Sequence, residues 1–392
     1  MSEVTSPPDG RPSDPAIVAA EPAAARSIAR EFVRADRGRV LDIFETVYGR
    51  EFRDNFDRLL DWQYLDNPYK PEGVPCSMVV EEDGRIVGFM GFYYSPTQVG
   101  PDVFPSCWII GFVTDPDARG SAGPRFVRQA SRSIDPVPVL LGNPGTHILR
   151  FWSWFKAGVC TTVPIMIRPV GLEFIAREKL PAALAGLAGA SSRAALKAAG
   201  GTVDRLAIAR ARRRGVVLER VESFGPELDG LWRRVRRLHP NMTLRDRDYL
   251  NWRYVDCPLA PYVIFVARID DDVVGYAASR VFDSKRMRKA VIVDLLADGD
   301  DPVITRALVA RSMQQFRAER VNLAYAIAPC QSLLPVLESM GFVARWDDAG
   351  GTRFVMGRVN VAGTAAQADF FDDRRWFVSF GDADYDLVSH LL

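Results

Sequence analysis

A short loop in the first third of the chain has the residue types of an anion site. Residues 119–124 read Arg-Gly-Ser-Ala-Gly-Pro, after an apolar run that ends at Thr114 and before an expected helix. A loop that follows a strand and opens a helix directs backbone N–H groups and the positive end of the helix dipole at one point. That geometry suits phosphate. An ordinary strand–loop–helix turn is the alternative, because Gly and Pro are also common turn residues.

The second candidate for chemistry is an acidic residue inside an apolar run. Asp294 lies within VIVDLL, residues 291–296. A carboxylate in such a strand is costly unless it is paired. Asp294 is therefore either part of a functional site or a structural residue satisfied by a backbone group or an arginine. The sequence leaves both interpretations open.

One pattern occurs twice in the chain. Residues 59–68 read LLDWQYLDNP and residues 249–258 read YLNWRYVDCP. The shared positions are Trp62, Tyr64, Asp66 and Pro68, which recur as Trp252, Tyr254, Asp256 and Pro258. Two rare tryptophans in one frame, with matching Tyr, Asp and Pro, predict an internal repeat.

The elements that must position these residues follow the same order in both halves. Each half reads as a strand, two helices, three strands, a helix, a strand, a helix and a final strand. Asp83-Gly84 lies between two apolar runs and predicts a hairpin, as do residues 270–272 in the second half. The expected fold class is α/β, with a mixed sheet of the α+β kind, in two tandem domains.

The composition of the chain sets the expected domain boundaries. We expect a Pro-rich disordered arm over residues 1–26 and domains at 27–170 and 215–360, with a helical basic linker at 171–214 between them. The linker is either a plain Ala-rich helix or a basic amphipathic helix that touches an anionic membrane through ARARRR. The tail, residues 361–392, is expected to dock the strand WFVSF and leave the acidic GDADYD solvated.

Charge, cysteine and histidine content exclude several classes of function. Lys+Arg 50 against Asp+Glu 49 leaves a net charge of +1, so we expect no nucleic-acid partner. Five scattered Cys without CxxC spacing indicate a reduced cytoplasmic protein without disulfides or a zinc site. The three His, at 147, 239 and 390, do not cluster in the sequence, so no metal is expected. No apolar run is long enough to span a bilayer, and the first residues lack the basic start and apolar stretch of a secretory signal, so neither a membrane span nor a signal is expected.

The chain resembles the GNAT acyltransferase superfamily, in a tandem arrangement of two such folds. The resemblance covers roughly residues 27–170 and 215–360. It is carried by the hairpins RIVGFMGF and DVVGYAAS, the strand-to-loop segment FVTDPDARGSAG, and the helix-to-strand joints FKAGV and ESMGF.

The resemblance implies that acetyl-CoA, or another acyl-CoA, is the co-substrate. In the family, a loop R/Q-x-x-G-x-G/A holds the diphosphate of CoA. Here Ala122 and Pro124 stand where the family has Gly, and Pro donates no N–H. The residues implied to bind CoA are Phe112, Val113, Thr114, Arg119, Gly120, Ser121, Ala122 and Gly123. In the second half, residues 297–302 read ADGDDP, whose carboxylates would repel a diphosphate.

The resemblance also implies positions for the catalytic and acceptor residues. Trp154 and Leu337 stand where many members place a Tyr as general acid, so that acid is missing from both halves. Asp294 is the implied catalytic base. The residues implied to line the acceptor site are Trp62, Tyr64, Trp252, Arg253 and Tyr254. Helix-to-sheet packing is the alternative role for both tryptophans.

The implied function is an acyl-CoA-dependent N-acyltransferase. Acetyl transfer to an amine of a small molecule, a sugar or a protein is expected, and the sequence does not choose among these acceptors. One alternative is an aminoacyltransferase of the related tandem-fold type. The other is a non-catalytic GNAT-fold scaffold in a membrane-associated complex, which the altered loop and the missing Tyr favour. The Arg-Gly loop retained in the first half favours the enzyme.

Overall fold

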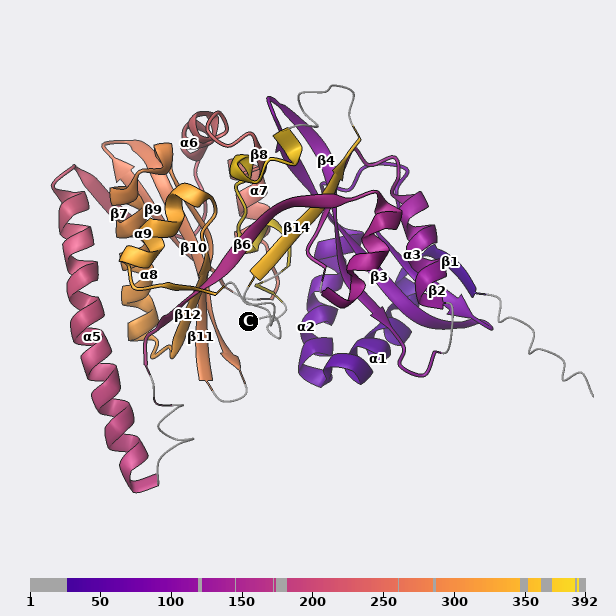
Figure 1. The fold of residues 1–392 in the computed structure, drawn as a ribbon, viewed down its shortest axis with the longest axis horizontal. Helices are drawn as coiled ribbons and strands as arrows, with labels where there is room; N and C mark the ends of the chain where they lie inside the picture. The colour runs from indigo at the N-terminus through magenta and orange to yellow at the C-terminus, as the bar shows by residue number, and fades with distance from the viewer. Residues whose placement is uncertain are drawn as a thin grey trace, which may run out of the picture.

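A single mixed sheet runs through the computed structural model of the chain (Figure 1). The structure describes residues 27–118, 122–144, 146–171, 173, 182–259, 261–284, 287–345, 352–360, 369–384 and 386–387. Within these residues, fourteen strands form one sheet in the order β1-β2-β3-β4-β5-β14-β6-β12-β11-β10-β9-β7, with β13 on β6 and β8 on β3. The expected mixed α/β fold is confirmed. The arm predicted at residues 1–26 lies outside the described residues.

The first half begins with a strand and two helices that cover the sheet. Its elements are β1 (Ser27–Glu31), α1 (Arg37–Tyr48), α2 (Arg50–Leu60), η2 (Asp61–Leu65), β2 (Ser77–Glu82), β3 (Arg85–Val99), β4 (Asp102–Thr114), α3 (Ala122–Ser133), β5 (Val139–Gly142), η3 (Thr146–Phe155) and β6 (Gly158–Pro169). Asp83 and Gly84 both have positive φ, 51° and 77°, and turn β2 into β3. This is the predicted hairpin, because such turns match the twist of paired strands.

The second half presents its elements in a similar order. They are β7 (Val216–Val221), α6 (Leu228–Val235), β8 (Asn241–Thr243), α7 (Arg247–Leu250), η4 (Asn251–Val255), β9 (Val263–Ile269), β10 (Asp272–Ser284), β11 (Met287–Ala297), η5 (Asp298–Asp300), α8 (Pro302–Ala318), β12 (Leu323–Ile327), η6 (Gln331–Leu333), α9 (Leu334–Ser339), β13 (Val343–Arg345) and β14 (Thr352–Val359). Helix α6 buries one apolar stripe, Leu228, Leu231, Trp232 and Val235. Its spacing of three and four residues explains why this segment is helical.

The two halves exchange strands at the middle of the sheet. Strand β14 pairs antiparallel with β5 on one side and with β6 on the other. Strand β6 in turn pairs with β12 and β13. Figure 1 shows β14 and β6 side by side where the halves meet. The sheet of the first half is therefore completed by a strand that lies near the end of the chain.

The segment between the halves is built around one long helix. Helix α5 (Ala182–Arg212) packs along α8 at one end of the molecule (Figure 1). Buried Asp204 holds it there, because its carboxylate pairs with Arg168 at 3.4 Å and also with Arg317. The helix expected within residues 171–214 is thus present. No helix among the described residues is long and apolar enough to cross a membrane.

Candidate functional site

The central feature of the first half is the place where strands β4 and β5 part. They pair in parallel from Ser106–Val139 to Ile109–Gly142, where β5 ends. Strand β4 continues beyond Ile109 to Thr114, and over this stretch it pairs only with β3 among the described strands. Its edge facing β5 is thus left without a strand partner. Gly111, at φ 61°, lies at a register shift in this stretch and bends β4 away.

The predicted CoA residues lie along this free edge and beyond it. Phe112 and Thr114 are half-buried, and Val113 is buried in the core beneath them. Arg119, Gly120 and Ser121 lie outside the described residues. Ala122 and Gly123 open α3. A Cβ at Gly123 would meet no atom within 4 Å apart from its chain neighbours and its own helix, so there is room for a side chain to start there.

A buried carboxylate fixes the start of the loop that connects β4 to α3. Asp115 accepts a hydrogen bond from the Asp117 N–H at 3.0 Å and pairs with Arg39 and Arg85. Burial alone would raise the pKa of Asp115, but the Asp117 N–H and Arg39 outweigh it and lower the pKa below its ordinary value. An ionised Asp115 therefore anchors the chain just before the predicted phosphate loop. In the sequence, Asp115-Pro116 before the loop matches the family pattern, but the pairing of Asp115 with Arg39 and Arg85 appears only in the fold.

Trp152, from η3, covers the carboxyl end of β5. A Cβ at Gly142 would lie 2.1 Å from Cη2 of Trp152, so only glycine permits this approach. Trp154, two residues later, has 38% of its surface exposed. Trp154 occupies the position where the resemblance expects a phenol, and an indole N–H does not serve as an acid near neutral pH.

The two repeated tryptophan segments meet at the interface of the halves. Both η2 and η4 are single π-helical turns. The Trp62 and Trp252 rings stack at 4.7 Å between centroids and 24° between planes. Tyr64 is fully buried beside Gly91, where a Cβ would lie 2.5 Å from the phenol oxygen. In this structure these predicted acceptor residues pack the interface, and their role in substrate binding stays a prediction.

Asp294 lies at the centre of a buried polar cluster. Its carboxylate accepts hydrogen bonds from Tyr276 at 2.8 Å, from Tyr254 at 3.1 Å and from Arg245 at 3.3 Å. Only 2% of its surface is exposed. Burial alone would lower the pKa of Arg245, but Asp294 and Asp382 outweigh this and raise it. Asp294 is thus satisfied by an arginine and two phenols, as the structural interpretation expected, and its role as a base stays a prediction.

The C-terminal segment supplies the other half of this buried charge. Arg253 donates to Asp386 at 2.6 Å and to the carbonyl oxygens of Gly381 and Ala383, both at 3.0 Å. Arg245 donates to Asp382 at 2.6 Å. The prediction that GDADYD is solvated is therefore wrong, since Asp382, Asp384 and Asp386 are all buried. In this structure Arg253 is bound within the chain.

At the matching place of the second half, the turn between β11 and α8 carries three carboxylates. Asp298 pairs with Arg234 at 2.5 Å, and Asp301 pairs with Arg214 at 2.8 Å while it also caps the first turn of α8. Asp300 lies 2.9 Å from His239. Carboxylates thus line the turn between β11 and α8, and the absence of diphosphate binding there stays a prediction.

A family model matches part of the first half. The model of the acetyltransferase (GNAT) family matches residues 39–122, from the start of α1 to the first residue of α3. The matched segment includes strand β4 and the first four residues of the predicted phosphate loop, 119–122. Residues 39–122 belong to a GNAT-family domain. A comparison with curated proteins finds no match for the chain.

Comparison with solved structures extends the GNAT fold to most of the chain. A conserved protein from Enterococcus faecalis V583 is 11% identical with a TM-score of 0.54, over 89% of this chain and 75% of that chain. A GCN5-related N-acetyltransferase from Anabaena variabilis ATCC 29413 is 13% identical with a TM-score of 0.56, over 85% and 73%. A fungal GCN5-related glucosamine N-acetyltransferase region is 14% identical with a TM-score of 0.53, over 86% and 38%.

Proposed function

We propose that this protein is an acyl-CoA-dependent N-acyltransferase that binds CoA in its first half. The observation that carries the proposal is the parting of β4 and β5 inside a GNAT-family domain, at the point where β4 leads to α3. The free edge of β4 offers backbone N–H and C=O groups to an extended, amide-containing chain such as pantetheine. The N-terminus of α3 offers N–H groups to the diphosphate.

The charges around α3 support an anionic ligand there. Arg125 is exposed in the first turns of α3, and Arg85 lies beside the anchored Asp115. The corresponding turn of the second half carries Asp298, Asp300 and Asp301 instead. We therefore place one CoA site in the chain, in the first half.

The proposed reaction is acyl transfer to an amine. The amine nitrogen attacks the acyl carbonyl carbon, the carbon–sulfur bond breaks, and the CoA thiolate takes up the proton that the amine loses. With Trp154 in place of a phenol, we propose that this proton reaches the sulfur through water. The acceptor classes are amines of small molecules, sugars and proteins, and the likeness in fold to a glucosamine N-acetyltransferase region supports an amino sugar as the first acceptor to test.

We also propose that the two halves are diverged copies of one domain. The order of elements from β1 to β6 resembles that from β7 to β13, and both tryptophan segments are π-helical turns. In this proposal the second copy has lost CoA binding and serves to complete the sheet and the interface.

The first experiment compares two variants of one residue in α3. Gly123→Glu places a carboxylate in the open first turn of α3, whereas Gly123→Gln has the same size without the charge. Unit charges about 4 Å apart repel by roughly 4 kcal/mol at an effective dielectric of 20. Calorimetry should show that Gly123→Glu weakens acetyl-CoA binding at least about tenfold relative to Gly123→Gln.

The same titrations decide between an enzyme and a scaffold. Acid residues are favourable in the first turn of a helix, so Gly123→Glu is expected to remain folded. Circular dichroism of each variant checks this. If the wild-type protein binds no acetyl-CoA at millimolar concentration, the proposal that it is an enzyme is wrong, and the non-catalytic scaffold is the remaining alternative. Equal binding of acetyl-CoA by the two variants would show that the diphosphate does not bind at the N-terminus of α3.

A further inference from the structure

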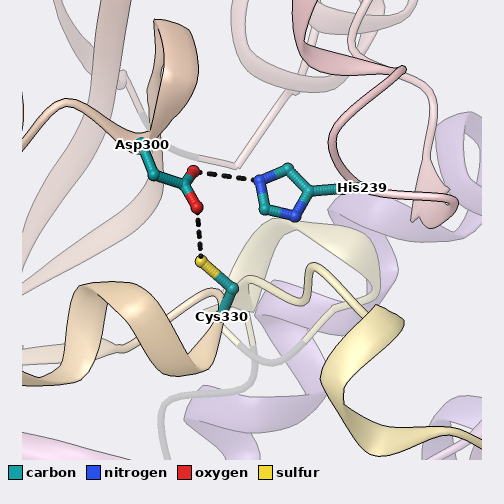
Figure 2. Close-up of side chains that lie close together, drawn as sticks. All are labelled: His239, Asp300 and Cys330. Atoms are coloured by element: carbon teal, nitrogen blue, oxygen red, sulfur yellow. Dashed lines mark hydrogen bonds and ion pairs between the residues drawn. The ribbon is translucent and has the colours of Figure 1, made fainter.

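Three side chains that can ligate a metal converge in the second half. They are His239, Asp300 and Cys330, which come from three separate segments of the chain (Figure 2). Their ligating atoms all lie within 4.8 Å of one another. Among the described residues this is the one group of three or more His, Cys, Asp and Glu with such a separation. His239 and Cys330 are buried, and Asp300 is half-buried.

Local backbone structure positions each residue of this cluster. His239 lies four residues after the end of α6 at Val235, and its carbonyl oxygen accepts a hydrogen bond from Gln98 of the first half at 3.1 Å. Asp300 ends the turn η5 with φ at 52°, a left-handed conformation that non-glycine residues seldom adopt. Cys330 precedes η6 and caps it. Unusual backbone of this kind is often found at functional sites.

The contacts between the three side chains leave no nucleophile–base pair. His239 Nε2 lies 2.9 Å from Asp300 Oδ1, and Cys330 Sγ lies 3.4 Å from Asp300 Oδ2 (Figure 2). The carboxylate therefore lies between the sulfur and the imidazole. A catalytic cysteine needs the imidazole at its sulfur, so this geometry does not support a thiol nucleophile.

The cluster lies at the place in the second half that corresponds to the proposed CoA cleft of the first. Strands β11 and β12 pair in parallel only from Lys289–Leu323 to Val291–Tyr325, after which β11 continues to Ala297. Asp300 follows the end of β11, and Cys330 follows the end of β12. The three residues thus lie shortly after the ends of β11, β12 and α6.

We propose that His239, Asp300 and Cys330 bind one zinc-class divalent cation. A nitrogen, a carboxylate oxygen and a sulfur are the ligands that zinc takes, at about 2.0–2.2 Å for nitrogen and oxygen and about 2.3 Å for sulfur. In a tetrahedral site such ligand atoms lie roughly 3.3–3.8 Å apart. The Nε2–Oδ1 separation of 2.9 Å is shorter than this range, and the Sγ–Oδ2 separation of 3.4 Å, to the other oxygen of Asp300, is within it. Because all three ligand atoms lie within 4.8 Å of one another, small side-chain shifts would seat a cation between them. Water would complete the tetrahedron. The Ser332 hydroxyl donates to Asp300 Oδ2 at 2.7 Å and so orients the carboxylate.

The bound cation would have a structural role. It would join α6, η5 and the end of β12 across the cleft that the second half no longer uses for CoA. His239 also packs against Phe377, with 4.8 Å between ring centroids, so the C-terminal segment covers the site. The inference does not depend on catalysis, because CoA is proposed to bind in the other half.

Cobalt substitution provides the test, because a thiolate ligand gives Co²⁺ an intense charge-transfer absorption in the near ultraviolet. Tag-free wild-type protein is expected to bind one Co²⁺ per chain with this band and to release it when Zn²⁺ is added. Cys330→Ser is expected to lose the band. His239→Gln is expected to weaken Co²⁺ binding at least tenfold, since it removes a ligand.

The matched control is Cys160→Ser, which changes a buried cysteine of the first half in the same way. It is expected to keep both the band and the affinity. If Cys330→Ser fails to fold, Asp300→Asn replaces it, and it is also expected to weaken binding at least tenfold. No charge-transfer band in the wild type at saturating Co²⁺, or a band unchanged in Cys330→Ser, would overturn the proposal.

Discussion

At the scale of single residues, the interior of this molecule is unusual for its charges. Arg245 and Arg253 are fully buried, and each faces carboxylates from the C-terminal segment. Asp384 lies in the same region with Gln63 as its hydrogen-bond partner at 3.5 Å. Burial raises the pKa of Asp384 from 3.8 to about 6. This carboxyl therefore opposes folding when it is ionised.

Replacing Asp384 by Asn should change how stability depends on pH. The folded chain binds this proton more tightly than the unfolded chain, so ionisation lowers the stability of the wild type as pH rises from about 4 to 6. Asp384→Asn removes that loss. The stability of the variant relative to wild type should rise by on the order of 2 kcal/mol between pH 4 and pH 7. Urea unfolding at several pH values measures it.

An exposed aspartate provides the control for the pH experiment. Asp54 lies on the surface of α2, with 52% of its side chain exposed. Asp54→Asn should therefore shift stability by less than about 0.5 kcal/mol at every pH. Parallel curves for wild type and Asp384→Asn would contradict the raised pKa.

The sequence identified some of these residues but not their partners. The position of Asp294 in an apolar strand marked it as a residue that needs a partner. Arg245, Tyr254 and Tyr276, which supply the bonds, lie on separate elements that only the folded chain brings together. Spacing along a chain carries no information on such contacts. For the same reason, the contact of His239 with Asp300 could not be predicted from the sequence.

At the scale of elements, local patterns were sufficient for the hairpins and for α5. The Asp83-Gly84 turn and the Ala-rich run of α5 need nothing beyond their own residues. The C-terminal segment could not be predicted in this way. Carboxylates are usually solvated. Here Asp382 and Asp386 are buried because Arg245, which precedes α7, and Arg253 of η4 pair with them. For the linker, residues 171–214, the expected contact with a membrane through residues such as the exposed Arg210 and Arg213 stays a prediction.

Arg253 should be essential for docking the C-terminal segment. Arg253→Met removes the closest charged partner of the buried Asp386, which keeps the Tyr262 hydroxyl, and it also removes donors to two carbonyl groups. Loss of one partner of a buried pair costs about 3–5 kcal/mol. Urea unfolding measures this cost. Limited proteolysis of the native variant should also release residues near the C-terminus sooner than in wild type.

The control for Arg253→Met is the same substitution at an exposed arginine that also pairs with an aspartate. Arg34 pairs with Asp61 at 2.5 Å, but 59% of its side chain is exposed. Arg34→Met should therefore cost less than about 1 kcal/mol. Equal costs for the two substitutions would mean that the buried pair does not hold the segment.

At the scale of the whole molecule, the exchange of β14 and β6 makes one unit of two domain-sized halves. Sequence predicted two halves with similar elements, and it placed residues 352–359 in the second. Their pairing with β5 and β6 was beyond prediction, because strands of either half have similar apolar patterns. The hydrophobic core confirms this unity, since one cluster contains residues from α1 and from β10.

The shared sheet predicts cooperative unfolding. Chains of this size often unfold domain by domain. Here the removal of either half would leave strand edges unpaired in the other, so we expect a single transition. Urea unfolding followed by far-ultraviolet circular dichroism and by tryptophan fluorescence should give coincident curves. Two separated transitions would show that the halves are stable independently.

The position of β14 also affects how the protein is made. The ribosome synthesises β5 and β6 long before β14, since about 190 residues separate the end of β6 from the end of β14. At about 5–20 residues per second this segment takes roughly 10 to 40 seconds to translate. Throughout that time the first half has emerged with the facing edges of β5 and β6 open. The nascent chain is therefore most exposed to misassociation, and most in need of chaperones, in the last part of its own synthesis.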